Sequence, residues 1–329
     1  HSLQEHSSCA NSLCYHGNTI RHKLEMSGEV QTFEPELAVD CKNALGESVV
    51  YDSDSKLLYW EDIEGKSIWE LNPESGEHRS WSLDERPGCI ALKQSGGLLV
   101  ALDKTGMATF NTEDGSVTPV CPFEPELENT RANDGRCDRQ GRLLVGGYNE
   151  TWRTDGGQET SGYYRFDANE TLTEVLDFKF RCANGTAFSP DGNTIYLNDS
   201  PKRLIWAFDY NTAEGTLSNQ RVLYTMEESE TGVPDGAQVD SEGYLWVAYN
   251  GGGRVCRHSP VDGTIDMQIN MPWKGVTTCS FGGADLDTLY ITTNRRRMTP
   301  EEEAAHPNAG GLYSVRPGVR GVPEPKFSG

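Results

Sequence analysis

The chain has 329 residues, with 50 Asp and Glu against 29 Lys and Arg, and its formal net charge is −21. This balance argues against a nucleic-acid partner, because phosphate backbones are bound by basic surfaces, and it weakly favours a cation site. No apolar run approaches the roughly 18 residues that a transmembrane helix needs, so no membrane partner is expected. The nine cysteines are scattered without a C-x-x-C pair, which indicates reduced thiols and a cytoplasmic location.

Residues 1–25 are polar and lack periodicity, unlike the rest of the chain. We expect a leader or extension there. It could be the remainder of a targeting peptide, which would indicate an organelle, a segment added by cloning, or a genuine extension. Residues 26–329 are expected to form a single domain.

From residue 26 onward, short apolar and aromatic strands alternate with turns rich in Gly, Asn, Asp and Pro. A first strand is expected near 30–33. Six units of strand, Gly turn, strand, loop, strand, turn and strand follow, within residues 48–76, 89–115, 136–176, 186–217, 232–269 and 278–318. Four-stranded repeats of about 40–50 residues are typical of propeller blades. We therefore predict an all-β fold, a six-bladed β-propeller with four-stranded blades, in which the strand near 30–33 pairs with the last blade and closes the ring.

One polar position recurs in four of the hairpins. It lies eight residues before the small residue that turns the hairpin, and it is occupied by Glu47, Asn133, Asn184 and Asp235. Singly, Asn-Gly and Asp-Gly are ordinary turn residues, but turn residues alone do not explain a repeated offset. The first strand of a propeller blade is innermost, so these oxygen-bearing side chains are expected to point at one centre. Two carboxylates and two amides suit calcium, magnesium or manganese better than a structural zinc.

Arg131 lies two residues before Asn133, and hence on the same face of the strand. It could hydrogen-bond a substrate hydroxyl or anion there, or form a salt bridge at the mouth. The seven His show no ligand spacing and no GxSxG occurs, so a serine–histidine triad is poorly supported. Three consecutive Arg occupy 295–297 and three consecutive Glu occupy 301–303. We expect this segment to be a solvated loop or a lid.

Several long motifs occur in the order found in one known family: RANDGRCDRQGRLLVGG, NGTAFSPDGNTIYLNDSPKRLIWAFDYN, GVPDGAQVDSEGYLWVAYNGGGRV and TTCSFGGADLDTLYITT. In these motifs the chain, over roughly residues 45–321, resembles the regucalcin/gluconolactonase family, which includes luciferin-regenerating enzyme. The resemblance implies a six-bladed propeller with lactonase activity and one divalent cation in the channel. It also implies the site residues, with Glu47, Asn184 and Asp235 as metal ligands and Arg131 and Asn133 as substrate contacts.

The chain departs from the family pattern in two places. The ungapped match to a substrate-contacting Glu of the family is Thr151, and Glu150 beside it is our candidate for that role. The usual Phe between the Arg and the Asn is Ala132, which would widen the pocket.

These expectations combine into a hypothesis for the reaction. A cation, calcium first and zinc, manganese or magnesium as alternatives, polarises the carbonyl of a small-molecule sugar lactone such as gluconolactone, and Asp235 takes a proton from the attacking water. The alternatives are a phosphotriesterase-like ester hydrolase that uses the same channel and a non-catalytic calcium-binding propeller. The oligomeric state is left open.

Overall fold

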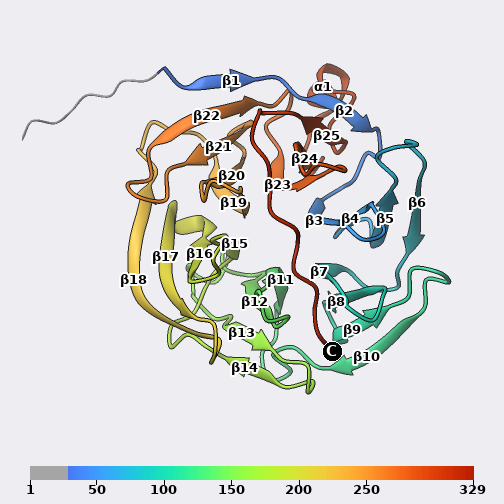
Figure 1. The fold of residues 1–329 in the computed structure, drawn as a ribbon, viewed down its shortest axis with the longest axis vertical. Coiled ribbons are helices and arrows are strands. Elements are labelled where there is room, and N and C mark those ends of the chain that lie inside the picture. The colour runs from blue at the N-terminus through green and yellow to red at the C-terminus, as the bar shows by residue number, and fades with distance from the viewer. Residues whose placement is uncertain (1–28) are drawn as a thin grey trace, which may run out of the picture.

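The structure is a computed structural model that describes residues 29–329, so the predicted leader at 1–25 lies outside the described residues. Six sheets, the blades, are arranged radially around a central axis (Figure 1). Within each sheet, strands that are consecutive in the chain are antiparallel neighbours and are ordered from the centre outward. The first two strands of the described chain are added at the outer edges of two of the sheets. The prediction of an all-β, six-bladed propeller with four-stranded blades is confirmed.

The first three blades are formed by consecutive strands. Blade 1 contains β3 (Gly46–Asp52), β4 (Leu57–Asp62), β5 (Ser67–Leu71) and β6 (His78–Ser82). Blade 2 contains β7 (Pro87–Leu92), β8 (Leu98–Leu102), β9 (Gly106–Phe110) and β10 (Val117–Cys121). Blade 3 contains β11 (Thr130–Cys137), β12 (Leu143–Asn149), β13 (Tyr163–Phe166) and β14 (Leu172–Glu174).

The remaining blades continue this order, and blade 6 takes its outer strand from the beginning of the described chain. Blade 4 contains β15 (Ala183–Phe188), β16 (Thr194–Asp199), β17 (Leu204–Asn211) and β18 (Thr216–Thr225). Blade 5 contains β19 (Val233–Val239), β20 (Leu245–Asn250), β21 (Arg254–His258) and β22 (Ile265–Asn270). Blade 6 contains β23 (Val276–Gly282), β24 (Thr288–Thr293), β25 (Leu312–Val315) and β2 (Glu36–Val39).

The predicted closure of the ring by residues 30–33 is wrong. That segment is β1 (Gln31–Phe33), which adds a fifth, parallel strand to blade 5 beside β22. The closing strand is β2, which pairs antiparallel with β25 and sets Val39 opposite Leu312. Both residues are buried in the same apolar cluster, so β2 covers the open edge of β25 with an apolar contact.

Neighbouring blades pack face to face through apolar side chains. The second strand of each blade is covered on both sides, and β8, for example, is buried throughout its sequence LLVAL. Between blades 5 and 6, Trp246 meets Phe281 edge to face, with ring centroids 5.9 Å apart. Such contacts hold the blades at fixed angles, and this rigidity positions the residues of the central channel.

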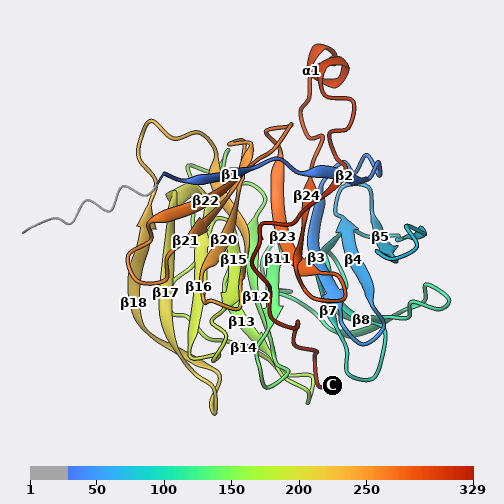
Figure 2. The ribbon, with the colours of Figure 1, turned by 45° about the horizontal axis from the view of Figure 1, so that its top comes forward.

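Two helical segments occur in the described chain, and both lie in loops. A 3-10 helix, η1 (Ser200–Lys202), follows β16. Helix α1 (Pro300–Ala305) projects from the ring between β24 and β25 (Figure 2). Thr299 begins α1 with a capping box, in which its side chain accepts from the backbone N–H of Glu302. No helix in residues 29–329 is long and apolar enough to cross a membrane.

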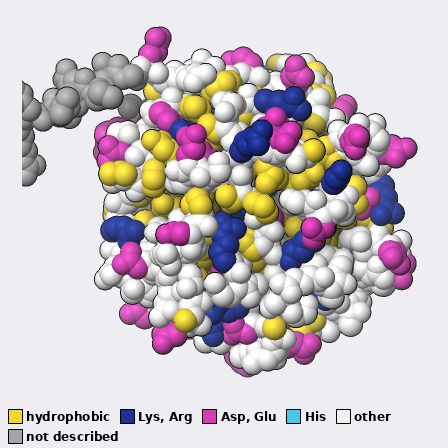
Figure 3. Space-filling model, in the orientation of Figure 1, with side chains coloured by type: hydrophobic (Ala, Val, Ile, Leu, Met, Phe, Trp, Pro, Cys, Tyr) yellow, Lys and Arg dark blue, Asp and Glu magenta, His cyan; other side chains and the backbone are white. Residues whose placement is uncertain are grey.

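The last residues of the chain cross one end of the channel, as Figures 1 and 2 show. Gly321 pairs with Asp240, just beyond the end of β19, and Phe327 packs into the apolar cluster between blades 2 and 3. Between them, the buried carboxylate of Glu324 pairs with Arg136 of β11. The space-filling view of this face has apolar side chains near its middle, between charged groups (Figure 3). The C-terminal segment thereby covers the channel at this end.

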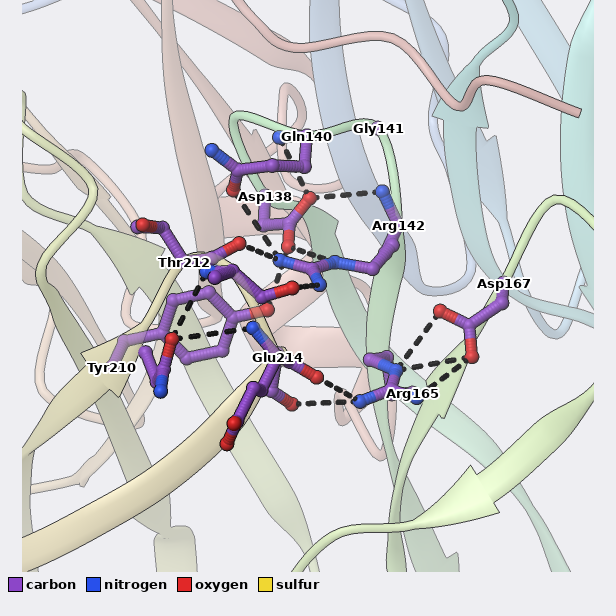
Figure 4. Close-up of polar contacts among 12 residues, drawn as sticks. Asp138, Gln140, Gly141, Arg142, Arg165, Asp167, Tyr210, Thr212 and Glu214 are labelled. Atoms are coloured by element: carbon purple, nitrogen blue, oxygen red, sulfur yellow. Dashed lines mark hydrogen bonds and ion pairs between the residues drawn. The ribbon is translucent and has the colours of Figure 1, made fainter.

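Blades 3 and 4 are also joined by polar contacts (Figure 4). Asp138 is the residue after β11. Its carboxylate accepts hydrogen bonds from Arg142 Nε and Tyr210 Oη, both at 2.6 Å. Arg142 Nη2 donates to the carbonyl oxygen of Thr212 at 2.6 Å, and Arg165 Nη1 donates to that of Glu214 at 2.5 Å. Because Asp138 accepts from both blades, it fixes their relative position at the end of β11 away from Asn133.

Candidate functional site

A cavity of about 290 Å³ opens at the start of the innermost strands. The four polar residues predicted from the repeated offset all line it, namely Glu47, Asn133, Asn184 and Asp235. They come from blades 1, 3, 4 and 5, so the ring brings together side chains up to 188 positions apart in the sequence. The C-terminal segment lies at the other end of the same strands, where Gly321 pairs with Asp240.

A β-bulge in every innermost strand positions these side chains. The pairing with the second strand shifts between Glu47 and Val50, Pro87 and Cys89, Ala132 and Gly135, Asn184 and Ala187, Pro234 and Ala237, and Val276 and Cys279. A bulge frees its residues from the regular ladder and redirects their side chains. Each of the four polar residues lies in such a bulge or directly before it, so the bulges turn them toward the axis.

Two glycines in these bulges are required by the close approach of neighbouring groups. Gly185 has a φ of +70°, and a Cβ there would lie 2.3 Å from the Asn198 amide nitrogen. At Gly236 a Cβ would lie 2.2 Å from Thr278 Oγ1 of blade 6. The Asn-Gly and Asp-Gly pairs therefore combine a polar side chain with a residue that lets another group come near.

The side-chain amides form a hydrogen-bonded row across the cavity. Arg131 Nη1 donates to Asn133 Oδ1 at 3.0 Å, and Asn133 Nδ2 donates to Asn184 Oδ1 at 2.8 Å. Asn184 Nδ2 in turn donates to Ser200 Oγ at 2.9 Å. These bonds fix the orientation of both amides, and an amide oxygen keeps a second lone pair for another partner.

Two carboxylates share the cavity. Asn250 Nδ2 donates to Asp235 Oδ2 at 2.9 Å, which holds that carboxylate in place. Burial raises the pKa of Asp235, and burial together with repulsion from Asp235 raises the pKa of Glu47. No Lys or Arg forms an ion pair with either carboxylate in residues 29–329. Two neighbouring acids without a paired base would gain from a bound cation, which would favour their charged forms.

The donor chemistry fits a divalent cation. Carboxylate and amide oxygens are the ligands that calcium, magnesium and manganese prefer. In the described part of the chain, no three His, Cys, Asp or Glu side chains are arranged to hold a metal ion, so a site here depends on amide oxygen as well as the two carboxylates. Glu47, Asn184 and Asp235, the predicted ligands, supply this combination, and Asn133 adds a further amide.

Arg131 lies at the wall of the cavity and is almost fully buried. Its guanidinium stands over the Tyr148 ring, 4.8 Å from the centroid, and its Nε lies 3.5 Å from Glu150 Oε1. Glu150 is bound at the same time by Arg86, with Nη1 and Nη2 at 2.8 and 3.0 Å from its two oxygens. Glu150 does not line the cavity, so the structure places it behind Arg131, and its predicted contact with substrate stays a prediction.

Comparison with known proteins identifies the family. Residues 45–295 match the SMP-30/Gluconolactonase/LRE-like region. The chain belongs to this family. It is 33% identical to regucalcin of Danio rerio over 91% of this chain and all of that protein, and 33% identical to L-arabinolactonase of Azospirillum brasilense over 89% of this chain and 95% of that protein. The crystal structure of regucalcin, a calcium-binding protein, from Agrobacterium tumefaciens superposes with a TM-score of 0.82 at 25% identity, over 91% of this chain and 98% of that one.

Other groups in the cavity of this SMP-30/gluconolactonase family member are unsuited to nucleophilic catalysis. Cys182 lines the cavity, but burial raises its pKa, so it stays a thiol rather than the reactive thiolate. None of the His residues in the described chain lines the cavity. Asp199 accepts from the backbone N–H of Cys182 at 3.0 Å and thereby supports the start of β15.

Sequence reasoning missed Glu61. It pairs with Glu47 across β3 and β4, is fully buried, and neither of its carboxylate oxygens has a hydrogen-bond partner in the described chain. Burial raises its pKa well above the usual range, so it is expected to be protonated. The signal in the sequence was the acid Glu61 itself, within the expected strand LLYWED. The structure places it opposite Glu47 on the neighbouring strand.

For the arginine run, the sequence left a solvated loop or a lid open and did not indicate which residues reach the cavity. Arg296 and Arg297 line it, together with Arg153 from the loop between β12 and β13. Arg296 and Arg297 are exposed, as expected of a solvated loop, whereas Arg295 is partly buried and does not line the cavity. Ser200 and Asn250 also line the cavity, and no sequence pattern set either apart.

Proposed function

We propose that the protein is a metal-dependent lactonase that opens the ring of a sugar lactone. Water adds to the ring carbonyl, the ring C–O bond breaks, and a hydroxy acid is released. The observation that carries this proposal is the convergence of Glu47, Asn133, Asn184 and Asp235 from four blades on one cavity beside Arg131. Relatives named as lactonases, such as the L-arabinolactonase, support the reaction class.

Glu47, Asn184 and Asp235 would hold one divalent cation. Calcium is the proposed ion, supported by the hard oxygen donors and by the description of the Agrobacterium tumefaciens regucalcin as calcium-binding. When bound, such an ion supplies Lewis acidity that stabilises negative charge on the carbonyl oxygen.

The protein's own side chains account for the remaining roles. Asp235 is proposed to take the proton from the attacking water, and Asn250 fixes the orientation of its carboxylate. Arg131 and Asn133 are joined to each other and are proposed to orient the ring hydroxyls of the substrate. Because the C-terminal segment covers the far end of the channel, substrate and product would exchange through the mouth beside Arg153 and Arg296.

A substrate panel tests this function. Calcium-loaded protein is assayed with several aldonolactones, with organophosphate triesters and with simple aryl esters, and Asp235→Asn is assayed beside it. We expect turnover of lactones and a fall in kcat of about 10²- to 10⁴-fold in the variant, as for loss of a general base. Preferred hydrolysis of triesters would indicate the phosphotriesterase-like alternative, and calcium binding without turnover would indicate the non-catalytic one.

A further inference from the structure

The cavity is rich in arginine, although the chain as a whole is strongly acidic. Its lining contains Arg131, Arg153, Arg296 and Arg297 but only two carboxylates. The net charge of the chain is −21, so a chance selection of side chains would favour acids. A bound divalent cation would make the cavity more positive still, and this charge calls for a negatively charged occupant.

Three of these arginines have guanidinium groups with little or no competition from acids. Arg153 donates to Tyr148 Oη at 3.1 Å and lies over the Trp152 ring, and neither contact neutralises its charge. Arg296 is 39% exposed and lies 3.5 Å from Glu64, a long ion pair at the surface. Arg297 is exposed, and within residues 29–329 it has no carboxylate at ion-pair distance.

The neighbouring Arg295 shows the contrast. It pairs with Glu303 of α1 at 3.4 Å and does not line the cavity. The same loop therefore carries one arginine that stabilises the helix and two that face the cavity. The charge at the mouth is thus a property of particular positions rather than of the loop as a whole.

These three arginines are exposed and line the cavity from two sides of the ring, so they stand at its mouth. Arg153 belongs to blade 3, whereas Arg296 and Arg297 follow β24 of blade 6, across the ring. The acids that would hold the cation lie in the innermost strands. A lactone whose carbonyl faces the cation held by these acids would extend its opposite end toward the mouth.

We infer that the substrate is a sugar lactone that carries an anionic group, a phosphate, sulfonate or carboxylate, at the end remote from the ring carbonyl. Arg296 and Arg297 bind this group, and Arg153 closes on it from the other side. Guanidinium groups match the oxygens of all three anions with paired, charge-assisted hydrogen bonds. The inference rests on the proposed lactonase function and names its substrate class.

The test compares matched neutral and anionic substrates. The substrates are gluconolactone, its 6-phosphate, its 6-sulfonate and a lactone that carries a carboxylate at the same position. They are assayed with four calcium-loaded proteins: wild type, the double variant Arg296→Gln/Arg297→Gln, Arg153→Gln and the control Arg295→Gln. We expect wild type to prefer at least one anionic lactone by 10-fold or more. The double variant lowers kcat/KM for that substrate about 10- to 100-fold, the loss typical of hydrogen bonds to a charged group, and changes gluconolactone less than 2-fold. Arg153→Gln lowers it in the same selective way.

The control Arg295→Gln removes the same charge from the same loop and should leave the preference intact. Raising the salt concentration should lower kcat/KM for the anionic substrate more than for gluconolactone, because ions screen exposed charges. The inference is overturned if wild type shows no preference, or if the double variant affects neutral and anionic lactones equally; lactone hydrolysis would then still stand. If no lactone of either kind is hydrolysed, the proposed function itself fails.

Discussion

Asn184 Nδ2 donates a hydrogen bond to Ser200 Oγ at 2.9 Å. This contact joins β15 to the first residue of η1. Ser200 Oγ uses its proton to donate to Asn198 Oδ1 at 3.3 Å, so it accepts from Asn184 and thereby engages the amide nitrogen. The amide oxygen accepts from Asn133 and keeps a second lone pair for another partner. A hydroxyl outside the ligand set thus determines whether Asn184 can act as a ligand.

Ser200→Ala is therefore expected to weaken calcium binding about 10-fold, in the range known for partners that orient metal ligands. Titration calorimetry on metal-stripped protein measures this. The matched control is Ser280→Ala, which removes another buried hydroxyl that makes no hydrogen bond in the described chain. Equal calcium affinities for both variants would show that the Ser200 contact does not orient the amide.

Glu61 should destabilise the metal-free protein. A buried polar group without a partner costs about 1–3 kcal/mol, and neither carboxylate oxygen of Glu61 has one. Glu61→Met keeps the length of the side chain and removes the polar atoms, so we expect the free energy of unfolding to rise by about 1–3 kcal/mol. Urea unfolding in the presence of a chelator measures it.

The same exchange at Glu70 serves as the control for Glu61. Glu70 is bound by Arg79 through two hydrogen bonds of 2.7 and 3.1 Å, so Glu70→Met should lower stability. A loss of stability in Glu61→Met as well would mean that the carboxyl group has a stabilising partner. If that variant also bound calcium more weakly, the partner would be the cation.

His258 should make the protein sensitive to mild acid. It is buried in blade 5 between Tyr249 Oη and the carbonyl oxygen of Gly263, each 2.9 Å away, and burial lowers its pKa to about 4. In the unfolded chain the pKa is about 6.5. Between these values only the unfolded chain takes up the proton, so the free energy of unfolding falls by about 3 kcal/mol as the pH drops from 6.5 to 4, with no further loss below.

His258→Gln cannot take up this proton, so its stability should depend less on pH within that window. Urea unfolding of both proteins at pH 7.5, 6, 5 and 4.5 gives the comparison. The difference in unfolding free energy between wild type and variant should shrink as the pH falls. Parallel pH curves would contradict the assignment of this loss to His258.

Much of the fold and site follows from local sequence signals. Gly turns between alternating apolar residues predicted the strands, and the repeated offset predicted that Glu47, Asn133, Asn184 and Asp235 converge. These features repeat from blade to blade, so each one supports the others. The structure adds the cause of the convergence, which is a bulge in each innermost strand. The repeated offset reflects these bulges but does not identify them.

Other features depend on contacts between distant segments and left no local signal. Closure by β2 rather than β1 depends on how Val39 meets Leu312, residues at opposite ends of the described chain. The local sequence did not indicate that Arg86, just before β7, binds Glu150 beside Arg131, and the contact of Glu150 with substrate stays a prediction. From the sequence, only the charge of the arginine run was evident. Which of its residues face the cavity depends on the path of the loop before α1.

Calcium titration of metal-stripped protein, followed by calorimetry and by lactone hydrolysis, tests the central claim most directly. We expect one calcium per chain, no hydrolysis before calcium is added, and recovery of activity in step with occupancy. Asp235→Asn and Glu47→Gln should each bind calcium much more weakly than wild type. Full activity in the presence of a chelator, or unchanged calcium binding in both variants, would contradict a cation held by these converging oxygen donors.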